Sequence, residues 1–311
     1  MNDYETILKA YELSGGNPRS LKFPATASIV VKENKVLSSQ EVEGLVMKSE
    51  ETETGVKVDI LVKKGYKIEN PVHLCFGVIP EEGLQEIIMQ IFLEDNSYAK
   101  LLAHCTFPNA IKVKHIMEAK IHIGRGAFLD YEEVHYHGLK GGIEVIPVVN
   151  ADIGPEGKLK NSFALVKGKV GNLDIDYNVE VGERAIAELT TKVYGKGEDK
   201  IKIKERAFLN GDGARSLIKS RVVAIDRAWS QVIGETYGNA PYTRGHVDCV
   251  EIVEGEAKAE AIPKVAVTNA LAKITHEASI GRIDKKQLET LMARGLEEKK
   301  AVDVIIGGAL K

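Results

Sequence analysis

Alternation of apolar and polar residues runs through the middle of this 311-residue chain. From about Ser28 to Ile274, short segments alternate residue by residue, which is the period of half-buried strands. Examples are residues 56–62, 119–123 and 200–204. Helical periodicity is missing from this region, which excludes an alternating α/β fold and leaves a sandwich, a barrel or a β-solenoid.

The two ends of the chain have a helical pattern instead. Residues 3–13 repeat apolar side chains at helical spacing, and so does the segment that begins at Asp284. Asp284 and Gln287 form a pair similar to a capping box, and Gly295 is a suitable residue to end that helix. A second helix is expected over about 297–306. The pattern therefore predicts a short amino-terminal helix and a carboxy-terminal helical hairpin.

A recurring local motif favours the solenoid among the three β folds. The order strand, glycine turn, small residue is found at 121–127 and again at 179–185. A stacked coil needs such repetition, because each turn can bury its apolar face only against its neighbours. The expected domains are an amino-terminal helical segment at 1–25, a β-helix core at 26–274 and a helical domain at 275–311.

The composition of the chain limits which kinds of partner and which cellular compartment are expected. The 42 basic and 45 acidic residues nearly balance, so neither a nucleic acid nor a membrane surface is an expected partner. The amino end has no basic region followed by an apolar run, as a secretory leader would. The three cysteines are too few and scattered for a disulfide framework, and the cytosol keeps such thiols reduced. We expect a cytoplasmic protein.

The carboxy-terminal third carries a recognisable signature. Residues 275–284 read THEASIGRID, and the apolar helix up to Leu296 follows them. This run resembles the closing signature of the SufB/SufD family, whose members are scaffolds for iron–sulfur cluster assembly. Residues 208–215 and 245–249 are similar to the core of the same family.

The resemblance implies a mainly β fold, a right-handed parallel β-helix with flanking helices. It also implies a homodimer, or a heterodimer with a related subunit, formed through the last turns. The terminal helices would dock on a SufC-type ATPase, and apo-proteins would accept the finished cluster. The expected ATPase-binding residues are Asp284, Gln287, Leu288, Leu291, Met292, Arg294 and Gly295.

Missing motifs refine this expectation. The sequence has no Gly-x-x-x-x-Gly-Lys-Ser/Thr loop, so we expect a scaffold that binds no nucleotide and is not itself an enzyme. It also has no Cys-x-x-Cys pair, so the expected iron–sulfur cluster is transient. Two alternatives stay open, which are a family adaptor that binds the ATPase without a cluster and a carbohydrate-active β-solenoid enzyme.

Three residues are the candidate cluster ligands. Cys249 matches a family cysteine associated with cluster formation, and a soft thiolate suits iron and sulfide. The alternative for Cys249 is a small buried apolar residue. His276 and Glu277 match family positions near the dimer interface, but adjacent strand residues point to opposite faces. Two copies meeting across a two-fold axis would unite them, whereas a role in capping the helices by hydrogen bonds is the alternative.

The remaining candidates lie nearer the amino end. Cys105 is in a segment that resembles the family's sulfur-entry site, where sulfur would arrive as a persulfide, and a charged His104 would lower its thiol pKa. An inert buried thiol is the alternative, and Cys75 is expected in the core. His135 and His137 share a strand face as a metal pair would, but spacing fixes no third ligand. Stacked surface histidines are therefore the favoured interpretation.

Overall fold

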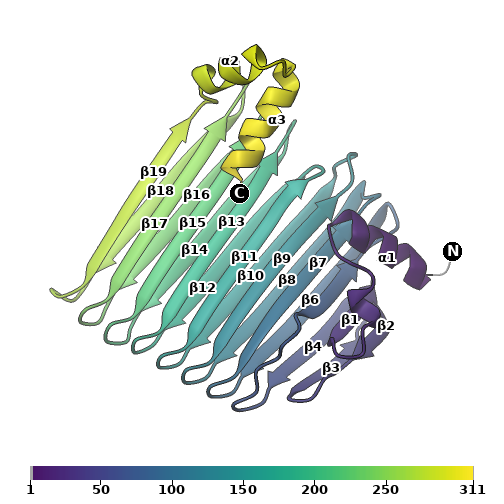
Figure 1. The fold of residues 1–311 in the computed structure, drawn as a ribbon, viewed down its shortest axis with the longest axis vertical. Helices are drawn as coiled ribbons and strands as arrows, with labels where there is room; N and C mark the ends of the chain where they lie inside the picture. Colours follow the sequence, from purple (N-terminus) through teal and green to yellow (C-terminus); the bar gives the residue numbers. More distant parts are fainter. Residues whose placement is uncertain (1–2, 311) are drawn as a thin grey trace.

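The computed structural model describes residues 3–310 and is mainly β, with 58% strand and 11% helix. Met1, Asn2 and Lys311, the outermost residues of the expected segments 1–25 and 275–311, lie outside the described part. The strands stack into a two-sheet β-solenoid of about 8 turns, with a short helix at one end and two helices at the other (Figure 1). The predicted fold class is therefore confirmed.

Each sheet collects alternate strands of the chain. The first sheet contains β1 (Ser28–Lys32), β2 (Lys35–Gln40), β5 (Val72–Gly77), β7 (Tyr98–Phe107), β9 (Phe128–His137), β11 (Lys158–Lys167), β13 (Ile186–Gly195), β15 (Arg215–Ala224), β17 (Arg244–Val253) and β19 (Lys273–Gly281). The second sheet contains β3 (Leu45–Glu51), β4 (Gly55–Val62), β6 (Glu82–Leu93), β8 (Lys112–Ile123), β10 (Ile143–Ile153), β12 (Asn172–Val181), β14 (Lys200–Leu209), β16 (Trp229–Gly238) and β18 (Lys258–Val267).

Parallel pairing keeps equivalent residues of successive turns in line. Only β1–β2 and β3–β4 pair antiparallel among the described strands. Thr191, Ser220 and Cys249 are successive register partners, so a turn takes 29 residues here. Ile121 likewise aligns through Ala151 with Val179. The two copies of the strand–glycine motif therefore lie two turns apart in one sheet.

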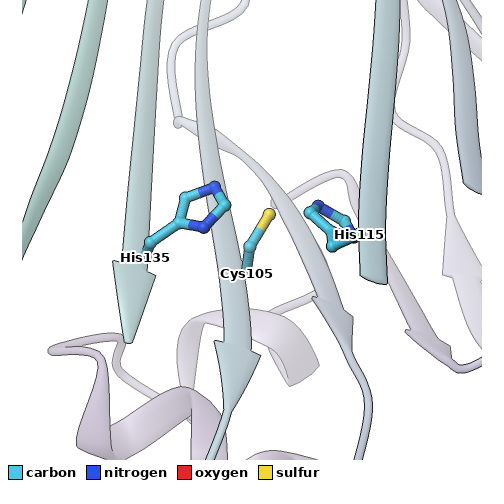
Figure 2. Close-up of side chains that lie close together, drawn as sticks. All are labelled: Cys105, His115 and His135. Atoms are coloured by element: carbon cyan, nitrogen blue, oxygen red, sulfur yellow. The ribbon is translucent and has the colours of Figure 1, made fainter. Parts of the chain in front are cut away.

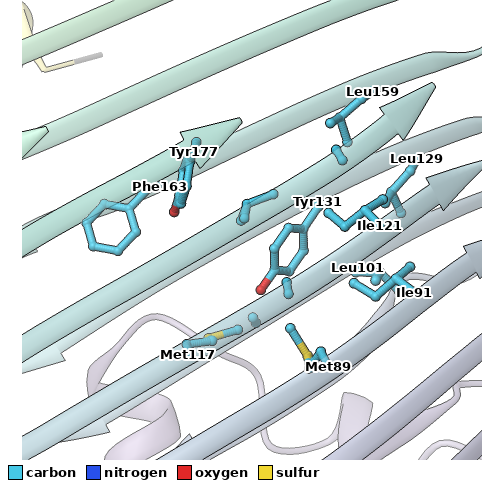
Figure 3. Close-up of a cluster of buried hydrophobic side chains, with 14 of the residues drawn as sticks. Met89, Ile91, Leu101, Met117, Ile121, Leu129, Tyr131, Leu159, Phe163 and Tyr177 are labelled. Atoms are coloured by element: carbon cyan, nitrogen blue, oxygen red, sulfur yellow. The ribbon is translucent and has the colours of Figure 1, made fainter. Parts of the chain in front are cut away.

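A continuous apolar core fills the space between the sheets. Side chains such as Met89, Tyr131, Phe163 and Tyr177 project into it from both sides (Figure 3). Successive strand residues alternate between this interior and the outer surface. Register partners in neighbouring parallel strands point to the same side of the sheet. If one of them faces the interior, its partners face the interior too.

The amino-terminal helix covers the outer face of the first sheet. It is α1 (Asp3–Leu13), the helix predicted over residues 3–13, and a short 3₁₀ turn, η1 (Ser20–Lys22), follows it. Tyr11 packs against Cys75, and its hydroxyl lies 2.8 Å from Nδ1 of His73. Ser14 Oγ lies 2.6 Å from Nδ1 of His104. The helix thereby seals two histidines and one thiol from solvent.

The carboxy-terminal helices form the predicted hairpin, α2 (Lys285–Ala293) and α3 (Glu298–Ala309). Asp284 caps α2 by accepting a hydrogen bond from the Gln287 backbone N–H at 2.7 Å. Gly295, with φ of +93°, follows the helix in the left-handed conformation that glycine tolerates. The boundary expected at residue 274 needs correction. Strand β19 stays in register with β17 as far as Gly281, so the solenoid extends to that residue.

Within residues 3–310, none of the helices combines the length and apolar character needed to span a membrane.

Candidate functional site

Cys249 lies inside the solenoid, on the next-to-last turn. Strand β17 directs its side chain inward, where it is 3% exposed. Burial raises the pKa of this thiol to about 12, and the nearby carboxyl groups of Glu251 and Glu205 add to the effect. Because the apolar interior disfavours a thiolate, Cys249 is a protonated thiol at neutral pH in this conformation.

His276 and Glu277 lie one turn further on, on opposite faces of β19. His276 is the register partner of the inward-facing Val247, and Ala278 is that of Cys249, so His276 shares the inner face with Cys249. Glu277 aligns with Asp248 on the outer face. Both candidate ligands are exposed. The alternation predicted from sequence is therefore present, and one chain separates the imidazole from the carboxylate.

The helix-capping alternative for these two residues is wrong. The cap of α2 is Asp284, and the residue preceding α3 is Glu297. His276 and Glu277 lie within a strand instead, because β19 continues the solenoid register beyond the expected boundary.

The last turn leaves the interior open at its end. Strands β18 and β19 stand at the ends of their sheet orders, so each has one unpaired edge within the described chain (Figure 1). Val267 and Ile280 occupy inward-facing register positions, yet they are 54% and 46% exposed. An apolar, half-exposed surface thus adjoins His276.

A polar row leads inward from this open end. Ser220 and Thr191 are the successive register partners of Cys249 along the first sheet. The apolar Phe163 interrupts the row at the next strand, and Glu133 follows it. From the second sheet, Glu205 accepts hydrogen bonds from Thr191 Oγ1 at 2.8 Å and from Ser220 Oγ at 3.0 Å. Burial raises the pKa of Glu205 to about 7. Sequence reasoning missed this row. The available signal was a polar residue, in successive strands of one sheet, at a position where the alternation predicts an inward-facing apolar residue.

Cys105 lies fully buried on β7, near the other end of the row. Burial raises the pKa of its thiol well above the usual value, and Glu133 and Cys75 contribute further. The expectation that a charged His104 lowers this pKa is wrong. His104 points to the opposite face under α1, and burial lowers its pKa to about 4, so the ring is neutral.

A compact group of donor atoms surrounds Cys105. The ligand atoms of Cys105, His115 and His135 all lie within 4.8 Å of one another (Figure 2). His135 Nε2 lies 2.6 Å from Glu133 Oε1, and His135 Nδ1 lies 3.4 Å from Nε2 of His137. The expectation of stacked surface histidines is therefore wrong, because the strand turns both rings into the core.

His115 is the member of this group that sequence reasoning did not single out as a ligand. The ring is fully buried, and neither of its nitrogens has a hydrogen-bond partner within residues 3–310. An unpartnered buried polar group costs about 1–3 kcal/mol, so such groups are rare. Its position among Val113, Met117 and Ala119, the apolar phase of β8, was the available signal.

The predicted ATPase-binding residues gather on and around α2. None of the residues within α2 itself is buried, and Met292 is 41% exposed. Asp284, Gln287 and Leu291 help to line a groove of about 840 Å³ that α2 forms with α3 and the end of β17. Leu288 is half-buried, and Arg294 and Gly295 are exposed at the turn that follows. The hairpin therefore presents a mixed apolar and polar surface to solvent.

Comparisons with known proteins identify the family. Residues 81–309 match the family model described as SUF system FeS cluster assembly, SufBD core domain. An iron–sulfur cluster assembly SufBD family protein of Methanocaldococcus jannaschii is 42% identical over 304 residues, which cover 98% of this chain and 96% of the relative. One from Pyrococcus horikoshii is 36% identical, covering 100% and 94%, and one from Archaeoglobus fulgidus is 24% identical, covering 79% and 66%. This chain belongs to the SufBD family of iron–sulfur cluster assembly proteins.

Proposed function

We propose that this chain is a scaffold on which an iron–sulfur cluster is built at the open end of the solenoid. The observation that carries the proposal is the alignment of Cys249 and His276 on one inner face, at the turn where the interior reaches solvent. Cys249 supplies the soft thiolate, and His276 and Glu277 supply weaker ligands that exchange more easily. Such a mixed set suits a site that must release its product.

A second SufBD subunit completes this proposed site. Glu277 faces away from Cys249 within one chain, so the carboxylate of one subunit has to meet the thiolate and imidazole of another. The free edges of β18 and β19 and the exposed Val267 and Ile280 support pairing through the last turn. The partner is an identical or a related subunit, and a two-fold axis at this turn would bring the ligands together.

An ATPase of the SufC type is the proposed source of energy. The helical hairpin is its proposed docking surface, since α2 is exposed and attached directly to β19. Movement of the hairpin would displace the last turn and admit water and iron to Cys249. Hydration lowers the pKa of a buried thiol towards its usual value, so opening would also favour the thiolate.

The row from Glu133 to Cys249 is the proposed interior path for sulfur from Cys105. Four strand spacings, or about 19 Å, separate Glu133 on β9 from Cys249 on β17. Glu205, Thr191 and Ser220 give a polar lining to the part of this stretch nearest Cys249. Because the Cys105 thiol is buried inside the solenoid, sulfur can reach it only if the surrounding strands or helix α1 move. The role of Cys105 in sulfur entry stays a prediction.

Anaerobic reconstitution tests the scaffold proposal. The purified chain, alone and with a SufC-type ATPase, is supplied with Fe²⁺ and sulfide, and the charge-transfer absorption of a cluster is recorded. Cys249→Ser should abolish this absorption, and His276→Ala and Glu277→Ala should reduce it. Cys75→Ser is the matched control, because it removes a buried thiol on the far side of the first sheet.

The raised pKa of Cys249 favours a second candidate, an adaptor that binds the ATPase without holding a cluster. In that case no cluster forms with or without the ATPase, while removal of residues 284–311 still abolishes ATPase binding. A full cluster spectrum in the Cys249→Ser variant would reject the assignment of the site.

A further inference from the structure

Three donor side chains converge inside the solenoid, far from its open end. Cys105 and His135 come from neighbouring strands of the first sheet, β7 and β9, and His115 comes from β8 of the second sheet. Their ligand atoms lie within 4.8 Å of one another, and all three residues are buried (Figure 2). The two sheets thus enclose one point with sulfur and nitrogen donors.

No contact of His115 within the core explains why a polar imidazole occupies this position. Its ring contacts the rings of Phe107 and His135, at centroid distances of 4.9 Å and 5.7 Å. Both of its nitrogens are buried without a hydrogen-bond partner among residues 3–310. Native proteins rarely leave a buried imidazole in this condition, and a bound metal ion would use the free lone pair.

His135 is held by the kind of contact that commonly supports a metal-bound imidazole. Its Nε2 lies 2.6 Å from a carboxylate oxygen of Glu133. A carboxylate at one ring nitrogen fixes the tautomer, so the nitrogen that would bind a metal is Nδ1, whose present neighbour is Nε2 of His137 at 3.4 Å. A backbone carbonyl plays the corresponding part at His137. Its Nδ1 donates to the Lys169 carbonyl at 2.9 Å, so its Nε2 carries the lone pair and lies 3.4 Å from Nδ1 of His135.

We propose that Cys105, His115 and His135 bind one divalent transition-metal ion of the Zn²⁺ or Fe²⁺ type, with water or His137, a neighbour of His135, as the fourth ligand. One thiolate with neutral imidazoles is a donor set for such ions and suits neither Mg²⁺ nor Ca²⁺. Bonds of about 2.0–2.3 Å in a tetrahedral site place donor atoms about 3.3–3.7 Å apart. Donors within 4.8 Å reach that geometry through side-chain shifts of about 1 Å.

Charge is compatible with a divalent cation here. The Cys105 thiol loses its proton to solvent when sulfur binds the metal, which gives one negative charge. The thiolate therefore halves the charge that a divalent ion brings into an apolar surrounding that includes Phe107 and Phe163.

This site is independent of the proposed cluster-assembly site. Five strand spacings separate β7, which carries Cys105, from β17, which carries Cys249, or about 24 Å. Loss of the Cys249 thiol therefore leaves the metal site intact, so the metal site and the Cys249 site are tested separately. The role of Cys105 in sulfur entry is not separate, because a Cys105 thiolate held by a stoichiometric metal ion would not carry a persulfide.

Cobalt is a suitable probe, because Co²⁺ replaces Zn²⁺ and Fe²⁺ and gives a thiolate-to-cobalt charge-transfer band. Since the site is buried, the full chain is expressed in minimal medium with added Co²⁺, so that loading occurs during folding. We expect one cobalt per chain by elemental analysis, together with that band and the visible bands of tetrahedral cobalt. The same protein from unsupplemented medium should contain Zn²⁺ or Fe²⁺, and elemental analysis tells which.

Variants distinguish a metal-binding site from buried side chains that only pack together. Cys105→Ser should remove the charge-transfer band, and His115→Leu should lower the cobalt content at least tenfold. Leucine fills the space without two unpartnered nitrogens, so circular dichroism of His115→Leu should show a folded chain. Cys75→Ser and the exposed His122→Gln are matched controls that keep both band and stoichiometry.

Three results would overturn the proposal. They are wild-type protein without stoichiometric metal, cobalt content unchanged in His115→Leu, and a band that persists in Cys105→Ser but is lost in Cys249→Ser. Thermal unfolding gives a readout independent of the spectrum. The metal-loaded wild type should melt higher than metal-stripped wild type, and His115→Leu should show no such difference.

Discussion

At the scale of single residues, the interior contains carboxyl groups that titrate near neutral pH. Burial raises the pKa of Glu133 to about 8, that of Glu205 to about 7 and that of Glu251 to about 7. A hydroxyl group donates to each of them: Tyr131 to Glu133, Ser220 to Glu205 and Ser230 to Glu251. These bonds stabilise the charged form in part, but desolvation dominates.

Glu205→Gln should make the protein more stable at alkaline pH. Between about pH 4.5 and pH 7 the folded chain keeps this proton while the unfolded chain releases it, so rising pH favours the unfolded state. Removal of the acid should add up to about 3 kcal/mol to the free energy of unfolding above pH 8, at 1.36 kcal/mol per pKa unit. Below pH 4.5 this difference should vanish.

Urea unfolding of both proteins at pH 4 and pH 8 measures the effect. Glu118→Gln is the control, because this glutamate is exposed on β8. Equal pH dependence in wild type and Glu205→Gln would show that the buried carboxyl does not control this part of the stability curve.

At the scale of secondary-structure elements, α1 acts as a cover for the first sheet. Tyr11 is fully buried and makes edge contacts with the rings of His73 and His104, at centroid distances of 6.3 Å and 4.6 Å. Cys75 lies beneath it, and burial raises its thiol pKa to about 12. A single helix thus keeps this thiol unreactive.

Tyr11→Ala should loosen α1 and expose Cys75. Loss of a large buried aromatic ring costs about 3–5 kcal/mol, most of which would fall on the docking of this helix. We expect a thiol reagent to modify Cys75 at least tenfold faster, and mass spectrometry of peptides identifies the cysteine. Lys9→Ala, on the exposed side of α1, is the control and should leave the rate unchanged. Faster labelling of all three cysteines alike would instead indicate global unfolding.

Local signals explain what the sequence predicted at this scale. Asp284 and Gln287 lie three positions apart, as in a capping box, so the start of α2 was predictable. The alternation within β19 likewise predicted that His276 and Glu277 point apart. The end of the solenoid was not predictable, because pairing of β19 with β17 depends on residues 29 positions away.

The convergence of the buried metal-donor side chains was likewise not predictable from local sequence patterns. His115 and Cys105 meet from different sheets, and nothing in either local pattern encodes that distance. The resemblance to the family named Cys105 and Cys249, but not the polar side chains between them. Only the stacked register aligns Thr191 and Ser220 with Cys249.

At the scale of the whole molecule, the two ends of the solenoid differ. The edge strands near the amino end, β2 and β3, each belong to an antiparallel pair, and β3 carries charged residues such as Lys48 and Glu50. Charged edges discourage pairing with other chains. The opposite end exposes Val267, Leu271 and Ile280 instead. The two ends of the solenoid therefore differ in character, one with charged edge strands and one with exposed apolar side chains.

Ile280→Arg should weaken association through the last turn. Burial of an isoleucine side chain contributes about 1.5–3 kcal/mol, so the dissociation constant should rise by about tenfold to a hundredfold. Analytical ultracentrifugation over a concentration series, alone and with a related subunit, measures this. Leu139→Arg is the matched control, because Leu139 is 82% exposed on the loop after β9, many turns from that end. Equal weakening by both variants would exclude the last turn as the interface.

The stacked register also constrains how such a protein can change in length during evolution. Duplication of a complete turn of about 29 residues would move the buried histidines one strand spacing, about 4.8 Å, further from Cys249 and leave both ends chemically intact. Insertion of one residue within a strand would instead turn each following side chain of that strand from core to surface. Relatives with longer or shorter solenoids should therefore differ by whole turns, and the distance between the two sites should change in equal steps.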